Sequence, residues 1–221
     1  MENIEIINFK SSLKNNVFAP EWHYVLCESQ IKNINFKKIS NLILKKEKII
    51  LKLPITNKVG SSDGYTGLGN NSITARHNKF NVLTWKSKEI ENIKNNIIFF
   101  HNNFLKKLNI KKPDNLYIQC WANVMRNGEQ IKPHLHDISP DTYLGGHICV
   151  QCENTSTHYI NPVNQINDPL IFSSKNEIGK ITLFQNCIPH YTDIHKGKKE
   201  RITIAFDLSL IKRSNNYIKL Y

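Results

Sequence analysis

The sequence lacks the long apolar runs and the regular cysteine spacing that mark membrane proteins and disulfide-bonded proteins. No apolar run approaches the roughly 18 residues that a membrane-spanning helix needs. The first residues show no basic segment followed by an apolar one, so we expect no signal peptide. The 5 cysteines are odd in number and irregularly spaced, which favours free thiols in a reducing compartment. These absences predict a soluble, cytoplasmic protein.

A second C-x-x-C pair is also missing. Cys149 and Cys152 form one such pair, but a structural zinc site needs further ligands. The pair lies in a run typical of a β-strand, where side chains alternate between faces, so positions 149 and 152 point to opposite sides. We therefore expect no metal or redox role for these thiols.

Acidic residues are scarce: the chain has 18 of them against 30 Lys and Arg, a formal net charge of +12. Such an excess suits an anionic partner such as nucleic acid. The lysines are dispersed through a chain rich in Lys, Asn and Ile, however, and only residues 195–201 form a dense basic run. We interpret the charge as a solvated basic surface. A nucleic-acid-binding module is kept as a third hypothesis, which predicts steeply salt-dependent binding.

The 221 residues suit one domain over 1–221. Residues 1–85 form an N-terminal elaboration with an opening strand, a short helix starting near Ser29, and a loop over 61–78 rich in Gly, Ser and Asn. The GYTGLG in this loop superficially resembles a phosphate-binding loop but lacks its flanking strand, helix and Lys.

Residues 86–112 hold the clearest helix. Apolar residues recur in steps of three and four from Ile90 to Leu108, which makes one helical stripe. Ser87 is a suitable N-cap, and Lys106 and Lys107 complement the helix dipole in the last turn. This stripe predicts a helix packed on a sheet.

Short β-rich segments follow over residues 115–210, separated by turn signals such as Asn127-Gly128. They favour an antiparallel sandwich or barrel. His134 and His136 stand two apart beside one such run, so they can face one cavity while Leu135 packs on the other side. Such a pair also arises by chance.

A second group of residues strengthens the metal hypothesis. His190 follows a strand, and in the strand RITIAF the residues Arg201 and Thr203 share the face opposite three apolar side chains. A guanidinium in a lined cavity can bind a carboxylate with two parallel hydrogen bonds, and Thr203 can add a third.

Other residues have two interpretations each. Gln119 and Asn123 alternate on one strand face and could reach a bound ligand or be satisfied core amides. His147 could line the pocket, but we expect a structural histidine. We expect Trp85 and Trp121 in the core. Five histidines fit no pattern and are expected at the surface or in local hydrogen bonds: His23, His77, His101, His158 and His195.

Together these segments resemble the iron(II)/2-oxoglutarate-dependent oxygenases of the prolyl-hydroxylase-like superfamily, and more narrowly a family of small oxygenases common in phages and bacteria. That family's segments run approximately as HxHxxxxLSGVYYV and FPSxxxHxVxPxxxxxRxSIAFN. This chain has HLHDISPDTYLGGHICV and LFQNCIPHYTDIHKGKKERITIAFD, and LYIQCWANVM is similar to the preceding strand. The resemblance covers about residues 115 to 210, and the His–Arg–Thr spacing is its more specific part.

The resemblance implies an α+β, mainly β fold: a double-stranded β-helix (jelly roll) with packing helices from the N-terminal half. It implies that His134, His136 and His190 hold Fe(II), and that Arg201 binds the distal carboxylate of 2-oxoglutarate with help from Thr203. The cofactors would be Fe(II), 2-oxoglutarate and O2. The expected reaction hydroxylates a peptide, protein or small molecule and releases succinate and CO2. A virus-encoded enzyme acting in the host cytoplasm would fit this family.

One departure concerns the ligand set, because the wider superfamily usually has H-x-D where this chain has His136. Three neutral imidazoles would leave the iron more positive. A bulge could instead turn Asp137 inward, or His136 could orient substrate while water completes the coordination. FQNC replaces FPS, and Asp207 replaces the family's Asn.

A cupin-like dioxygenase or isomerase is the alternative function, since it also uses H-x-H and a distal histidine on a jelly roll. It predicts no carboxylate-binding role for Arg201. The basic run at 195–201 suggests an acidic substrate, and the 61–78 loop could act as a lid.

Overall fold

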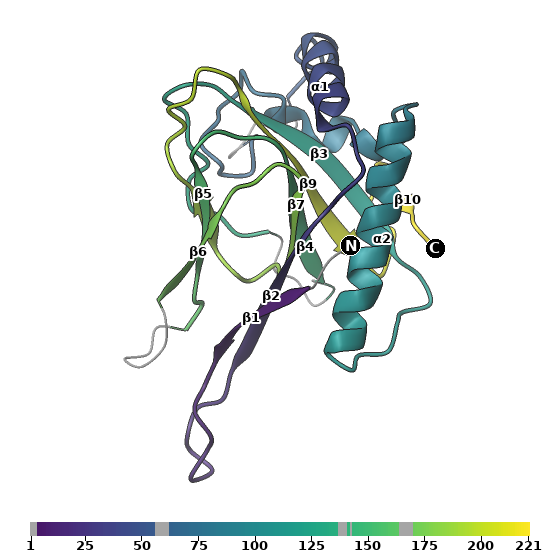
Figure 1. Ribbon diagram of the computed structural model, residues 1–221. Helices are drawn as coiled ribbons and strands as arrows, with labels where there is room; N and C mark the ends of the chain where they lie inside the picture. The colour runs from purple at the N-terminus through teal and green to yellow at the C-terminus, as the bar shows by residue number, and fades with distance from the viewer. Residues whose placement is uncertain (1–3, 56–61, 137–140, 142, 164–169) are drawn as a thin grey trace.

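The structure is a computed structural model that describes residues 4–55, 62–136, 141, 143–163 and 170–221. Its strands form two antiparallel sheets, and two α-helices lie on one side of the larger sheet (Figure 1). Among the described residues, no helix is both long and apolar enough to cross a membrane. The fold is mainly β with few helices, as the sequence predicts.

The large sheet has seven strands in the order β1-β2-β7-β4-β9-β3-β10. The small sheet has the order β6-β5-β8. The bounds along the chain are β1 Glu5–Lys10, β2 His23–Gln30, β3 Tyr117–Met125, β4 Leu144–Gln151, β5 Ser156–Ile160, β6 Ile171–Lys175, β7 Lys180–Gln185, β8 His190–Thr192, β9 Arg201–Ser209 and β10 Ile218–Lys219.

The chain passes back and forth between the two sheets, which makes a jelly roll. After β3 in the large sheet, residues 131–134 hydrogen-bond to β8 beside the small sheet. The chain then returns to β4, crosses to β5 and β6, returns to β7, crosses to β8 and returns to the large sheet for β9 and β10. This alternation brings the middle and the end of the chain to facing walls of one sandwich.

Helix α2, Lys88–Lys107, confirms the predicted apolar stripe. Ser87 caps it by accepting a hydrogen bond from the N–H of Glu89, and the stripe from Ile90 to Phe104 is buried. These side chains join one core with the outward-facing residues of β3, β4, β7 and β9. The helix therefore covers the face of the large sheet that points away from the small sheet (Figure 1).

Helix α1, Phe36–Ile50, starts later than expected. Its N-cap is Asn35, whose side chain accepts from the N–H of Lys38. The expectation of a start near Ser29 was wrong, because Ser29 lies in β2 and pairs with Ile181 of β7. A serine cap signal and a strand end look alike in sequence, and the sheet pairing decided between them.

The predicted loop over 61–78 is partly helical. Two 3-10 helices, η1 Thr74–Lys79 and η2 Val82–Thr84, follow an irregular stretch. The buried Arg76 donates hydrogen bonds to the carbonyls of Leu53, Asn70 and Ser72, among others. This arginine ties the irregular stretch to the end of α1.

Candidate metal centre and cosubstrate pocket

A cavity of about 230 Å³ lies between the two sheets and is lined by residues of both. The large sheet contributes β3, β4, β7 and β9, and the small sheet contributes β5 and β8. The irregular stretch before η1 closes one side through Asp63, Gly64 and Thr66. Every residue that the sequence assigned to metal or cosubstrate binding lines this cavity: Asn123, His134, His136, His190, Arg201 and Thr203.

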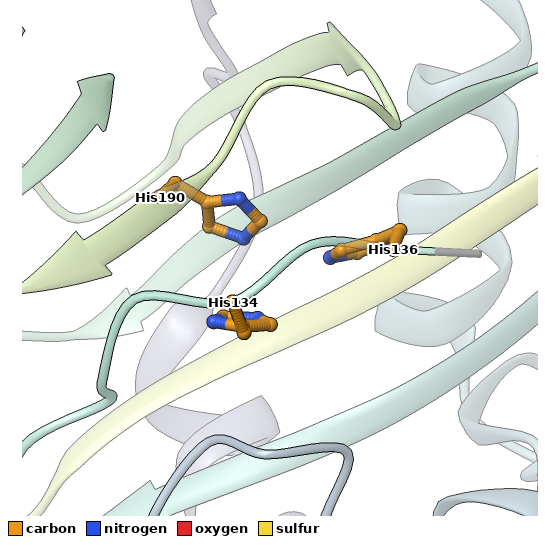
Figure 2. Close-up of side chains that lie close together, drawn as sticks. All are labelled: His134, His136 and His190. Atoms are coloured by element: carbon orange, nitrogen blue, oxygen red, sulfur yellow. The ribbon is translucent and has the colours of Figure 1, made fainter. Parts of the chain in front are cut away.

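His134, His136 and His190 converge in the cavity, and each offers a ring nitrogen within 4.8 Å of the others. The ring centroids of His134 and His190 are 4.3 Å apart, and those of His136 and His190 are 5.1 Å apart. Figure 2 shows the three rings, each with a nitrogen turned toward the space between them. A single metal ion could take all three nitrogens as ligands.

The segment carrying His134 and His136 is not a regular strand, contrary to the prediction. His134 forms an isolated bridge to His190, with N–H to carbonyl distances of 3.2 and 3.1 Å. Leu135, expected to pack on the opposite side, is 43% exposed. The side chains of His134 and His136 still both point into the cavity. The side chain of Leu135, between them, points toward solvent and not into a core.

The second nitrogen of each ring is held by an acceptor. Nδ1 of His134 contacts the carbonyl of Lys132 at 2.9 Å, and Nδ1 of His190 contacts the carbonyl of Ile188 at 3.2 Å. A carbonyl oxygen only accepts, so both Nδ1 atoms carry the ring proton. Their Nε2 lone pairs are then available, which is the arrangement in most metal-binding histidines.

Burial keeps His134 and His190 uncharged. It lowers the pKa of His134 to about 4, with a further contribution from His136. Burial also lowers the pKa of His190 well below its usual range, and the neighbouring His134 and His136 add to this. Neutral imidazoles are the form that binds a metal ion, so no proton has to be displaced near pH 7.

His136 has a different partner, which the sequence interpretation missed. Its Nδ1 forms a hydrogen bond with Oδ1 of Asp207 in β9. Asp207 pairs across the sheet with Gly145 of β4, and a Cβ at Gly145 would lie 2.8 Å from Nδ1 of His136. The glycine therefore leaves the space that the imidazole occupies. Asp137, the alternative ligand, lies outside the described residues.

Arg201 lies at the far end of the cavity and is only 2% exposed. Its terminal nitrogens contact Sδ of Met125 at 3.3 Å and Oγ1 of Thr157 at 3.4 Å, and its Nε has no partner among the described residues. Burial lowers the pKa of this guanidinium. A buried cation with neutral neighbours is costly unless an anion joins it, so the pocket suits a carboxylate ligand.

Thr203 and Asn123 face each other across β9 and β3 and both line the cavity. Oδ1 of Asn123 accepts a hydrogen bond of 2.8 Å from Thr74. Gln119 instead donates to the carbonyl of His77 at 2.7 Å and is absent from the cavity wall. Of the two alternatives for Gln119, the structure supports the satisfied amide.

Trp121, His77 and His147 also line the cavity. The ring centroids of Trp121 and His136 are 6.0 Å apart, so Trp121 is part of the site as well as the core. The signal was present in the sequence, because Trp121 shares the strand face of Gln119 and Asn123. His77 comes from η1, and no sequence pattern connects it to the site.

Some expectations lead away from the cavity. Lys196 and Lys198 border a separate surface depression beside Glu153, so these two lysines, unlike Arg201 at the end of the basic run, do not line the candidate active site. His101 and His195 are fully buried rather than exposed. His195 makes the expected local hydrogen bond, to the carbonyl of Lys199, whereas His101 contacts the distant Tyr143 and Tyr221. Cys149 faces the sandwich interior, and Cys152 lies just past the end of β4.

Comparison with known proteins gives one sequence match. The sequence model of the family described as "Putative 2OG-Fe(II) oxygenase" matches residues 119–207, a segment that contains the three histidines, Arg201, Thr203 and Asn123. No curated protein matches the chain.

Solved structures similar to this chain share little sequence with it. A 2OG-Fe(II) oxygenase family oxidoreductase from Burkholderia pseudomallei has 17% identity and a TM-score of 0.37, over 43% of this chain and 45% of that one. A prolyl-4-hydroxylase from Pseudomonas putida has 10% identity and a TM-score of 0.43, over 57% and 67%. AviO1 from Streptomyces viridochromogenes has 9% identity and a TM-score of 0.45, over 58% and 64%. This chain thus spans less than half of the first of these structures.

The sequence match and the geometry concern the same residues. Enzymes of the matched family are oxidoreductases that use Fe(II), 2-oxoglutarate and O2, and the donor set of three convergent imidazoles and a buried guanidinium suits these groups. Residues 119–207 of the chain are therefore similar to the 2OG-Fe(II) oxygenase family.

Proposed function

We propose that this protein hydroxylates a C–H bond of its substrate, with Fe(II), 2-oxoglutarate and O2. In this reaction one atom of O2 enters the substrate, the other enters succinate, and CO2 leaves. The observation that carries the proposal is the cavity itself, which has three histidines at one end and, at the other, a buried arginine whose Nε has no partner among the described residues.

In this proposal His134, His136 and His190 hold the metal through Nε2, while Lys132, Ile188 and Asp207 orient the rings. Arg201 and Thr203 bind the distal carboxylate of 2-oxoglutarate. When bound, the iron and the 2-oxo acid supply the oxidising chemistry.

The chain's own residues position the reactants and exclude water. The side chains of Phe184, Trp121 and Ile131 form an apolar wall around the histidines, which strengthens the electrostatic contacts inside the cavity. Asp63, Thr66 and His77 line the wall on the side of the irregular stretch, and we propose that the primary substrate, a peptide, protein or small molecule, contacts them.

Anaerobic titration with Fe(II) and then 2-oxoglutarate tests the proposal, followed by measurement of succinate after O2 is added with candidate substrates. Arg201→Gln should leave Fe(II) binding intact and weaken 2-oxoglutarate binding by about 10- to 100-fold, since it removes a charge-assisted pair of hydrogen bonds. Arg213→Gln, outside the cavity wall, is the matched control.

Two results would contradict the proposal. One is a wild-type protein that binds Fe(II) but not 2-oxoglutarate. The other is unchanged 2-oxoglutarate binding by Arg201→Gln. Both would favour a cupin-like metal enzyme, which does not require this arginine.

A further inference from the structure

His147 occupies an unusual place in the cavity wall. It is 8% exposed and lines the cavity, and its Nδ1 is buried without a hydrogen-bond partner among the described residues. Nε of Arg201, in the same cavity, shares this property. Leaving a buried polar group unpaired costs free energy, so two unpaired nitrogens in one cavity indicate a polar ligand.

The sheet register places His147 between the two ends of the cavity. Gly145, two residues before it, pairs with Asp207 at the histidine end. Cys149, two residues after it, pairs with Thr203 at the arginine end. Since alternate residues of a strand share a face, His147 lies between the candidate iron ligands and Arg201.

The partner of the other ring nitrogen indicates which nitrogen carries the proton. Nε2 of His147 lies 2.6 Å from the hydroxyl of Tyr159, a fully buried residue whose ring is parallel to the imidazole. We infer that Tyr159 donates to Nε2, because a phenol O–H is a stronger donor than a neutral imidazole N–H, and the ring proton then lies on Nδ1.

His147 is also uncharged. Burial, with a further contribution from the charge of Arg201, lowers its pKa to about 3. The side chain is therefore a neutral donor beside a buried cation. A carboxylate can accept from both, because its two oxygens offer about four lone-pair sites.

We propose that Nδ1–H of His147 donates a hydrogen bond to the carboxylate of 2-oxoglutarate that Arg201 binds, and so helps to select a dicarboxylic 2-oxo acid. This inference rests on the proposed function. In the family segment LSGVYYV a valine stands where this chain has His147, so the donor is a feature of this chain rather than of the quoted motif.

Two amide variants separate the ring nitrogens. The amide of His147→Asn lies near the place of Nδ1 and keeps a donor there, whereas the amide of His147→Gln lies near Nε2 and loses the donor. Each is loaded anaerobically with Fe(II) and titrated with 2-oxoglutarate and with 2-oxobutyrate, which lacks the distal carboxylate. We expect His147→Gln to weaken 2-oxoglutarate binding about tenfold, His147→Asn to stay within about threefold, and 2-oxobutyrate binding to be unchanged in both.

The outcomes are distinct. If wild-type protein binds no 2-oxoglutarate, the proposed function fails. If wild-type protein binds it and His147→Gln binds it equally well, or loses equal affinity for 2-oxobutyrate, only the role of His147 is overturned.

A measurement on wild-type protein covers the case in which the variants do not fold. In protein loaded with Zn(II) and carrying ¹⁵N-labelled histidine, the Nδ1–H signal of His147 should shift when 2-oxoglutarate is added and not when 2-oxobutyrate is added. The same signal with and without 2-oxoglutarate would overturn the inference.

Discussion

At the scale of single residues, the three candidate ligands differ in what holds them. His134 and His190 donate to main-chain carbonyls, which no side-chain substitution removes. His136 depends on the carboxylate of Asp207, a side chain. A carboxylate paired with a ligating imidazole orients the ring and raises its basicity. In an H-x-D pair the carboxylate binds the metal directly, whereas here the carboxylate of Asp207 would act through the imidazole ring of His136.

Asp207→Asn should therefore weaken Fe(II) binding by about tenfold, since loss of such a partner usually costs 10- to 100-fold in metal affinity. An amide keeps the size of the side chain but removes the charge. The affinity is measured by anaerobic metal titration, and Asp114→Asn, an exposed site away from the cavity, is the control. Equal affinities for Asp207→Asn and wild type would show that the pair has no influence on the metal.

At the scale of elements, one face of strand β4 packs in the hydrophobic core and the other face lines the candidate site. The adjacent glycines Gly145 and Gly146 show this division. A Cβ at Gly145 would approach His136, while a Cβ at Gly146 would lie 2.6 Å from the carbonyl of Thr182 and against the ring of Phe206. Each glycine leaves space for a neighbour on its own side of the sheet.

Gly145→Ala should reduce metal affinity by about tenfold, because the imidazole of His136 is displaced. Gly146→Ala should instead lower the free energy of unfolding by about 1–3 kcal/mol through overpacking. Metal titration and chemical denaturation of both variants check this. The same loss of metal affinity in both variants would contradict the division.

Helix α2 contributes to stability through its apolar stripe. Phe100 is fully buried and Phe99, its neighbour, is 51% exposed. Phe100→Ala should lower the free energy of unfolding by about 3–5 kcal/mol, whereas Phe99→Ala should change it by less than about 0.5 kcal/mol. Urea denaturation measures both, and comparable losses in the two variants would mean that the helix packs differently.

At the scale of the whole molecule, buried histidines make stability depend on pH. His101 of α2 is fully buried, contacts the hydroxyls of Tyr143 and Tyr221, and has a pKa lowered to about 4, mainly by burial. Its contacts connect α2, the segment before β4 and the last residue. An unfolded chain would protonate this histidine near pH 6.5.

Between pH 6.5 and 4 the folded protein thus binds fewer protons than the unfolded chain, so stability is full above about pH 6.5 and falls as the pH falls toward 4. His101 should account for at most about 3 kcal/mol of this loss. In His101→Gln the profile of unfolding free energy against pH should be flatter by that amount, while Asn95→Gln, at an exposed site of the same helix, keeps the wild-type slope. Parallel profiles for His101→Gln and wild type would contradict this assignment.

The sequence alone determined the elements that local chemistry governs. The 3.6-residue stripe and Ser87 predicted α2, and strand alternation put Arg201 and Thr203 on one face. The resemblance to a known family implied one shared site for His134, His136, His190 and Arg201. These predictions need no tertiary contacts, because a helical stripe or a strand face is set by residues close in the chain.

Tertiary structure alone decided what depends on residues distant in the chain. The pairing of Ser29 with Ile181 moved the start of α1, the register of β9 with β4 brought Asp207 to His136, and the packing of β5 against β4 brought Tyr159 to Nε2 of His147. Each depends on which strands become neighbours, and that is a property of the folded sandwich, since such contacts leave no period or spacing in the sequence.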